Sequence, residues 1–290
     1  MKFVTYKDPG ESGRYRIGSL LVNNRIADLT GLVSEEALTA DEVNRCYDLD
    51  GGFFKGVTGA VIENLPQVDL ASVSLCSPVP RPGKVICIGL NYRDHAEESG
   101  MAIPQSPLIF SKFSSCVTGP GEDIILPAAS SQVDYEAELA VVIGRRSSKV
   151  SAAEAMASVF GYANFNDVSA RDFQFADGQW QRGKSCDTFA PMGPFVATAD
   201  EIPSPQDLRI QFRLNGETLQ DSSTRQLIFG IAELIEFLSR DITLEPGDVI
   251  ATGTPPGVGF ARNPPIFMAD GDVAEVEIQG LGILSNPVKR

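Results

Sequence analysis

The sequence predicts an α+β protein that is mainly β, with a small N-terminal α/β domain and a larger C-terminal domain. Two observations carry this prediction. Strand-length apolar runs and segments that alternate apolar and polar residues dominate the later part of the chain, where few segments have a helical pattern. Residues 77–83 hold three prolines and suit the interior of neither a helix nor a strand. We therefore place the N-terminal domain at 1–72, a linker at 73–83 and the C-terminal domain at 84–290.

The N-terminal domain begins with short strands. Residues 15–22 read as a strand that ends at a turn formed by Asn23 and Asn24. The hydroxyl of Ser34 can cap a helix that runs to about Arg45. These elements predict a unit that combines strands with at least one helix.

Most of the C-terminal domain reads as strands. Residues 84–90 and 136–143 are apolar runs with the length of a buried strand. Residues 208–214 alternate with period two up to Asn215-Gly216, a pair typical of a tight hairpin turn. Residues 273–278 alternate in the same way.

Two segments of the C-terminal domain read as helices. A capping box from Ser151 to Glu154 starts an alanine-rich helix that we expect to reach about residue 160. Apolar residues at helical spacing predict a second helix between residues 229 and 240.

The net charge of the chain indicates which classes of binding partner are disfavoured. Lys and Arg number 24 and Asp and Glu number 38, for a formal net charge of −14. That sign disfavours nucleic acid and anionic membranes, which both bind clustered cations. Because the chain has a single histidine, His95, sites built on two imidazoles are excluded. Any bound metal must then be held mainly by carboxylates, which suits Mg²⁺ or Mn²⁺.

The cysteines and the apolar runs bear on the compartment. The five cysteines include no CxxC spacing, so a reducing compartment is expected and no disulfide framework or zinc knuckle is indicated. The N-terminal residues lack the apolar stretch of a signal peptide, and the longest apolar runs are far shorter than a membrane span. We expect a cytoplasmic protein.

One motif match does not predict its usual ligand. Residues Gly178–Ser185 fit the GxxxxGK(S/T) pattern of nucleotide phosphate loops. Such a loop follows a buried strand and opens a helix. Here residues 172–177 hold few aliphatic side chains, and Pro191 and Pro194 follow closely. We therefore do not interpret this segment as a nucleotide site.

Three acidic residues form the most informative pattern. On a strand, Glu136 and Glu138 project from the same face, and the apolar run after them indicates burial. Two buried carboxylates repel each other unless a cation balances them. Asp167 follows a short alternating segment and can supply a third carboxylate to a Mg²⁺ site completed by waters. Two alternatives stay open, a solvated strand edge for the glutamates and ordinary turn chemistry for the aspartate.

His95 lies in a charged segment with Glu98 three residues later. On a short helix these side chains can touch. A carboxylate partner orients an imidazole and raises its basicity, as a water-activating base requires. The alternative is a charged surface turn.

Together these segments resemble the fumarylacetoacetate hydrolase superfamily over residues 82–288. The matching motifs, in chain order, are Gly89-Leu90-Asn91-Tyr92 with His95, Asp134 to Leu139, Asn166 to Asp172, Gly183 to Pro194, and Gly247 to Gly259. Each motif alone is weak evidence for the family, but five motifs in this order are specific to it. The stretch from Gln179 to Pro194 is most similar to the short members called fumarylacetoacetate hydrolase domain-containing proteins.

The resemblance implies a mixed β-sandwich roll for the C-terminal domain and a homodimeric assembly. It also implies Mg²⁺ or Mn²⁺ held by Glu136, Glu138 and Asp167, in agreement with the strand argument. The founding hydrolase has a further acidic ligand about seven residues before the histidine, where this chain has Ile88. No fourth protein ligand is therefore expected.

The resemblance assigns further roles around the metal. It implies that Lys184 binds the substrate, helped by Arg171 and Gln174, and that Thr254 contacts the substrate carboxylate. It also implies that His95 and Glu98 activate a water on a lid that orders over the substrate.

The expected activity is metal-dependent hydrolysis of a C–C bond in a 2,4-dioxo acid, of the acylpyruvate or diketo sugar acid type, through a metal-stabilised enolate. The same site can serve an oxaloacetate decarboxylase or tautomerase, or a 2-oxo acid isomerase, because fold and metal do not fix the fate of the enolate. A third reading is a non-catalytic metal- or ligand-binding protein, against which the retained His95, Glu98 and Lys184 argue. The expected partner is a small-molecule 2-oxo acid.

Overall fold

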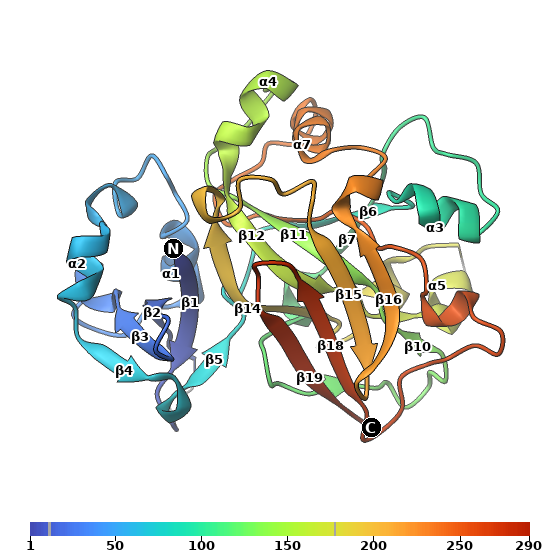
Figure 1. The fold of residues 1–290 in the computed structure, drawn as a ribbon, viewed down its shortest axis with the longest axis horizontal. Coiled ribbons are helices and arrows are strands. Elements are labelled where there is room, and N and C mark those ends of the chain that lie inside the picture. The colour runs from blue at the N-terminus through green and yellow to red at the C-terminus, as the bar shows by residue number, and fades with distance from the viewer. Residues whose placement is uncertain (11–12, 177) are drawn as a thin grey trace.

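Two β-sheets packed face to face form the body of the protein (Figure 1). The computed structural model describes residues 1–10, 13–176 and 178–290. Strands β11 (Ala137–Ile143) and β12 (Val159–Asn166) of the larger sheet contact β18 (Val273–Ile278) of the smaller sheet, and β11 also contacts β15 (Arg209–Leu214). Most strand pairs are antiparallel and a few are parallel. The predicted α+β, mainly β class and the mixed sandwich are confirmed.

The larger sheet runs from the N-terminal strands at one edge to β7 at the other, with β5 paired to β1 and β8 paired to β14. Its other strands, in spatial order, are β4 (Gln67–Asp69), β3 (Arg25–Asp28), β2 (Arg16–Leu20), β1 (Lys2–Lys7), β14 (Ala190–Thr198), β12, β11, β17 (Val249–Ala251), β6 (Val85–Gly89) and β7 (Leu108–Lys112), and the two branches are β5 (Ser74–Cys76) and β8 (Val117–Thr118).

The smaller sheet covers one face of the larger one (Figure 1). Its order is β16 (Glu217–Ser223), β15, β18, β19 (Ile283–Lys289) and β9 (Ile124–Ile125), and a separate pair joins β10 (Val133–Asp134) to β13 (Ser169–Ala170). The hairpin predicted at Asn215-Gly216 joins β15 to β16. Both turn residues have positive φ, 53° and 81°, as a tight hairpin of this type requires.

Short helices lie at the ends and edges of the sheets. The α-helices are α1 (Ala40–Arg45), α2 (Gly59–Glu63), α3 (Arg93–Glu98), α4 (Ala152–Ala155), α5 (Arg171–Ala176), α6 (Gln181–Lys184) and α7 (Ile231–Ser239). The 3-10 helices are η1 (Thr30–Leu32), η2 (Phe54–Gly56), η3 (Leu70–Ser72), η4 (Ser114–Cys116), η5 (Met156–Ser158), η6 (Ala199–Glu201), η7 (Thr224–Gln226) and η8 (Gly259–Ala261). None of the helices in the described ranges has the length and apolar character needed to cross a bilayer.

The first helix differs from its prediction. It begins at Ala40 rather than at Ser34, because Thr39 forms the capping box. The Thr39 hydroxyl accepts the N–H of Glu42, and the Glu42 carboxylate accepts the N–H of Thr39 (2.7 Å). Ser34 instead accepts the N–H of Glu36 in a turn.

The N-terminal strands extend the larger sheet. Strand β1 pairs antiparallel with β14 through Lys2–Ala197 and Phe3–Val196. The Phe3 ring packs edge-on against Tyr47 at 5.3 Å and against Phe160 at 6.0 Å. Backbone pairing and aromatic packing therefore both join the first residues to the C-terminal strands, and the division at 73–83 stays a prediction.

Strands β11 and β12 lie in the middle of the larger sheet and are buried along their whole length. Such strands read as continuous apolar runs, because both of their faces are covered. A carboxylate carried by one of these strands is therefore held in the core of the protein.

Candidate active site

Three carboxylates converge where β11 begins and β12 ends. Ala137 pairs with Asn166 across these strands, and the N–H of Asp167 donates to the carbonyl of Glu136 (2.9 Å). Carboxylate oxygens of Glu136, Glu138 and Asp167 lie within 4.8 Å of one another. The three residues are 8%, 1% and 0% exposed. The solvated-edge alternative for the glutamates is therefore wrong.

Buried cations surround two of these carboxylates. The Lys184 Nζ lies 2.7 Å from Glu136 Oε2 and 2.8 Å from Asp167 Oδ2. The Lys112 Nζ lies 2.5 Å from Asp167 Oδ1, and Arg171 Nη2 lies 2.7 Å from Glu136 Oε1. Burial lowers the pKa of Lys184, but the carboxylates of Asp167 and Glu136 outweigh that effect and raise it. Lys184 is therefore an ammonium.

Glu138 has no cation partner among the residues that the structure describes. Its Oε2 accepts the N–H of Gly253 (2.8 Å). Burial, followed by the charges of Asp167 and Glu136, raises the pKa of Glu138 well above its usual range. In Glu136, burial likewise raises the pKa, but Lys184 and Arg171 together outweigh burial, and the pKa falls to about 2. A divalent cation between the three carboxylates supplies the positive charge that Glu138 lacks, so the residues fit a metal.

The oxygens that face the shared centre, Glu136 Oε2 and Asp167 Oδ2, are contacted by the Lys184 Nζ, so a metal there would share them with the ammonium. Outside that contact, one oxygen of each of the three carboxylates is held by the protein: Asp167 Oδ1 by Lys112, Glu136 Oε1 by Arg171, and Glu138 Oε2 by the Gly253 N–H. Three single-oxygen ligands would leave the remaining coordination positions of a six-coordinate cation for water and substrate. This arrangement suits Mg²⁺ or Mn²⁺.

The loop after β17 carries two of the groups around the centre. Gly253 has φ +104°, and a Cβ there would lie 2.8 Å from the Asn91 side chain, so only glycine fits. This conformation aims the Gly253 N–H at Glu138. The next residue, Thr254, accepts a hydrogen bond from Gln220 Nε2 (2.9 Å). The Thr254 O–H therefore remains to donate to a substrate.

His95 and Glu98 lie together on α3. The His95 Nδ1 is 3.3 Å from Glu98 Oε2. The Glu98 carboxylate also accepts the N–H of Gly257 (3.0 Å and 3.1 Å), which ties α3 to the loop that carries Thr254. In the described part of the chain, no hydrogen bond joins His95 directly to the three carboxylates. The structure thus brings the two residues of the predicted dyad together, beside the loop.

Arg171 is bonded to the protein through three of its nitrogens. Nη1 donates to Gln174 Oε1 (2.9 Å), Nε donates to Asp134 Oδ2 (2.9 Å), and Nη2 reaches Glu136. Asp134 in turn accepts the N–H groups of Gly259 (2.7 Å) and Phe260 (3.0 Å). The guanidinium therefore orients Glu136 and joins α5 to the glycine-rich loop.

Lys112, Asp134 and Gln220 also belong to this site, although the sequence did not predict them there. Lys112 had one signal, since it lies two positions after Phe110 and on a strand would share its face. Asp134 is the first residue of the Asp134 to Leu139 motif, but its position before a strand gave no sign of a role in the site. Gln220 carries no local pattern, because its partners are 34 and 83 residues away in sequence.

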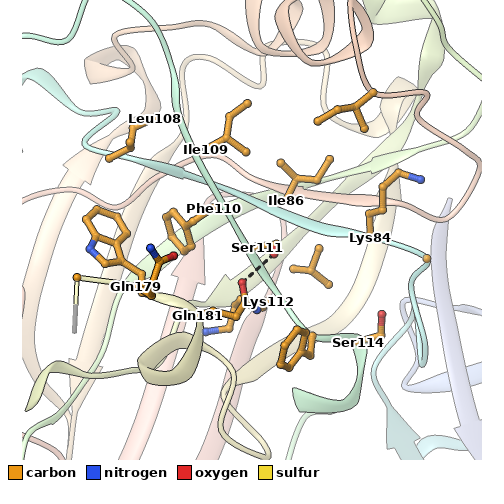
Figure 2. Close-up of a pocket in the computed structure, with 16 residues that line it drawn as sticks. Lys84, Ile86, Leu108, Ile109, Phe110, Ser111, Lys112, Ser114, Gln179 and Gln181 are labelled. Atoms are coloured by element: carbon orange, nitrogen blue, oxygen red, sulfur yellow. Dashed lines mark hydrogen bonds between the residues drawn. The ribbon is translucent and has the colours of Figure 1, made fainter. Parts of the chain in front are cut away.

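A cavity of about 880 Å³ lies beside β6 and β7 (Figure 2). Ile86, Leu108 and Ile109 line it, and Ser111 donates a hydrogen bond to Gln181 across one side (3.0 Å). Lys112 borders this cavity, but Glu136, Glu138 and Asp167 do not contribute to its described lining. The three carboxylates therefore lie outside the lining of this cavity, and Lys112, which contacts Asp167, borders it.

The chain is similar to proteins of known family. The family model described as fumarylacetoacetate (FAA) hydrolase C-terminal matches residues 84–289. The Rattus norvegicus protein named oxaloacetate tautomerase Fahd2a, mitochondrial, is 48% identical over 230 residues, which cover 79% of this chain and 74% of that protein.

Solved structures match over the whole chain. Fumarylacetoacetate hydrolase from the psychrophile Exiguobacterium antarcticum has a TM-score of 0.85 at 37% identity, covering 100% of this chain and 99% of that one. Maleylpyruvate hydrolase from Sphingobium sp. SYK-6, solved with a manganese(II) ion and pyruvate, has a TM-score of 0.82 at 32% identity, with 100% and 99% covered.

Proposed function

The chain belongs to the fumarylacetoacetate hydrolase family, and we propose that it is a divalent-metal-dependent tautomerase of a 2-oxo acid of the oxaloacetate type. The observation that carries the proposal is the Lys184 ammonium, 2.7 Å and 2.8 Å from oxygens of Glu136 and Asp167. It places a positive charge beside the metal position, where an enolate oxygen develops negative charge. Similarity to a named oxaloacetate tautomerase supports this reaction over the C–C bond hydrolysis that the sequence analysis placed first.

The chain's own residues bind and orient the substrate. Bound to Glu136, Glu138 and Asp167, Mg²⁺ or Mn²⁺ would supply a Lewis acid for the keto oxygen. Lys184 donates a hydrogen bond and positive charge to the same end of the substrate. The Thr254 O–H donates to the carboxylate. Tautomerisation moves one proton between the carbon next to the keto group and the keto oxygen, and it consumes no water.

The charge of the buried cluster explains how an acidic protein attracts an anionic substrate. Three cationic side chains face four carboxylates in this cluster, namely Lys112, Arg171 and Lys184 against Asp134, Glu136, Glu138 and Asp167. With all four acids ionised the cluster is negative, and a divalent cation makes it positive. The local field then opposes the repulsion from the net charge of −14.

Metal removal is expected to abolish the activity. We expect tautomerisation of oxaloacetate, followed by the ultraviolet absorbance of the enol, to fall at least about 100-fold in EDTA and to return with Mg²⁺ or Mn²⁺. The control is Glu136→Ala, which loses a metal ligand. Its tautomerase activity should change neither in EDTA nor on addition of Mg²⁺ or Mn²⁺. Activity that persists in EDTA would contradict the proposal.

A second candidate, hydrolysis of an acylpyruvate, is favoured by the His95–Glu98 pair at 3.3 Å. A histidine oriented by a carboxylate is the arrangement of a water-activating base. Tautomerisation does not require such a water.

His95→Ala separates the two reactions. We expect this variant to keep tautomerase activity within about 10-fold of wild type, and to lose any acylpyruvate hydrolysis by about 10²–10⁴-fold. Initial rates on oxaloacetate and on acylpyruvates, measured with the same Mg²⁺-loaded preparation, give both numbers. Equal losses on both substrates would assign His95 to the tautomerase reaction and overturn this division of roles.

Two further properties stay predictions. The homodimer implied by the family resemblance can be checked by the sedimentation of the purified chain. The cytoplasmic location expected from the sequence can be checked by microscopy of the tagged protein, and the rat relative's name places that relative in mitochondria.

A further inference from the structure

Lys112 is a buried lysine at the end of the edge strand β7. Its side chain is 0% exposed. The Nζ donates to Asp167 Oδ1 at 2.5 Å and to the carbonyl of Val168 at 2.9 Å. These two bonds fix the ammonium on the outer oxygen of a predicted metal ligand. A surface role for Lys112 is excluded by its burial.

The two oxygens of Asp167 have different surroundings. Oδ2 lies on the shared centre, because the Lys184 Nζ that contacts it also contacts Glu136. Oδ1 is occupied by Lys112. Both oxygens thus accept a lysine ammonium, but only Oδ2 lies on the shared centre. A metal bound there meets Oδ2 and would reach Oδ1 only if the Lys112 bond were broken.

The number of oxygens that a carboxylate offers discriminates between cations. Mg²⁺, like Mn²⁺, accepts six ligands in near-octahedral geometry and is satisfied by single oxygens and waters. Ca²⁺ takes six to eight oxygens at longer distances and commonly uses both oxygens of a carboxylate. A site that withholds the second oxygen therefore favours the smaller cation.

Resting on the metal centre of the proposed function, we propose that Lys112 determines the cation specificity of this site. By holding Asp167 Oδ1, it restricts Asp167 to one-oxygen coordination and selects Mg²⁺ or Mn²⁺ against Ca²⁺. Lys112 is the position where this effect can be isolated. Arg171, which holds Glu136 in the same way, also bonds Asp134 and Gln174, and the donor on Glu138 is a backbone N–H.

The test measures cation affinities of the intact chain by calorimetry after EDTA treatment and dialysis. The wild type is expected to bind Mg²⁺ and Mn²⁺ more tightly than Ca²⁺. Lys112→Met frees Oδ1, and the ratio of the Ca²⁺ to the Mg²⁺ dissociation constant should fall by about 10-fold or more. Loss of the lysine charge strengthens the binding of both divalent ions alike, so it cancels in the ratio.

Two further variants control this experiment. Lys112→Gln removes the charge but keeps an N–H donor for Oδ1, and its ratio should stay within about 3-fold of wild type. Lys84→Met breaks another lysine–aspartate pair, with Asp248 at 2.7 Å, whose carboxylate is not one of the three proposed metal ligands. It should leave the ratio unchanged.

Specific outcomes overturn the inference. An unchanged ratio in folded Lys112→Met, or a shift of the same size in Lys112→Gln, removes the role of the Oδ1 bond. If circular dichroism shows that Lys112→Met does not fold, the wild-type affinities provide the test. Tighter binding of Ca²⁺ than of Mg²⁺ by the wild type also overturns the inference. A wild type that binds none of the three cations instead refutes the metal centre itself, and with it the proposed function.

Discussion

Lys184→Met is expected to destabilise the protein in EDTA by about 3–5 kcal/mol and to regain most of that stability in Mg²⁺ without regaining activity. The substitution leaves Glu136 and Asp167 without the ammonium that they share at 2.7 Å and 2.8 Å. Breaking a buried ion pair on one side leaves uncompensated charge, which is strongly destabilising. A divalent cation takes the same two oxygens and so restores their charge balance.

Activity should not follow stability in this variant. Lys184 also supplies charge and a hydrogen bond to the substrate, and a metal cannot replace it at that position. We expect kcat/KM to stay about 10²–10³-fold below wild type with saturating Mg²⁺. Urea unfolding in EDTA and in Mg²⁺, together with the enol assay, measures both effects.

Lys289→Met is the matched control for Lys184→Met. Lys289 pairs with Asp123 at 2.8 Å, but the two side chains are 59% and 32% exposed. Removal of an exposed pair changes stability by less than about 1 kcal/mol, and Mg²⁺ should not alter the result. A Lys184→Met variant that behaves like this control would refute the buried network as the source of the effect.

Glu138→Gln is expected to weaken metal binding strongly and yet to stabilise the protein in EDTA. Glu138 lacks a cation partner in the described structure, and burial with the neighbouring carboxylates raises its pKa well above the usual value. A buried acid of this kind favours the protonated form, which a glutamine amide resembles. Loss of one ligand oxygen should weaken Mg²⁺ binding at least about 100-fold.

The sign of the pH dependence follows from that raised pKa. The folded state binds the Glu138 proton more tightly than the unfolded state does. The resulting stabilisation is present below the ordinary pKa of the carboxyl, 4.5, and is lost as the pH rises through the higher folded value. Wild type in EDTA should therefore lose stability over this range, whereas Glu138→Gln should lose less.

Thermal unfolding from pH 4 to pH 9 in EDTA checks this expectation. Each kcal/mol that the glutamine contributes at high pH raises the melting temperature by about 2–4 °C. The control is Glu154→Gln, which alters an exposed capping box on α4 and should lower stability slightly at all pH values above the carboxyl titration. A Glu138→Gln protein that melts below wild type at pH 8 in EDTA would count against a protonated Glu138.

Local patterns in the sequence determined the strands and the three carboxylates. Alternation before Asn215-Gly216 and the apolar run after Glu138 are short-range features, so they predicted β15, the hairpin and the buried β11 without knowledge of the fold. The start of the first helix was predicted wrongly, because the Ser34 hydroxyl satisfies only part of the pattern, whereas Thr39 and Glu42 form the complete capping box.

The tertiary structure alone decided how those carboxylates are held. Lys112 is 55 residues from Asp167, and Gly253 is 115 residues from Glu138. Their meeting depends on the pairing of β6 with β7 and of β11 with β17, which no spacing in the sequence encodes. The sequence by itself therefore determined which residues can bind a metal. The long-range strand register decided which oxygen of each carboxylate is held by the protein and which faces the shared centre.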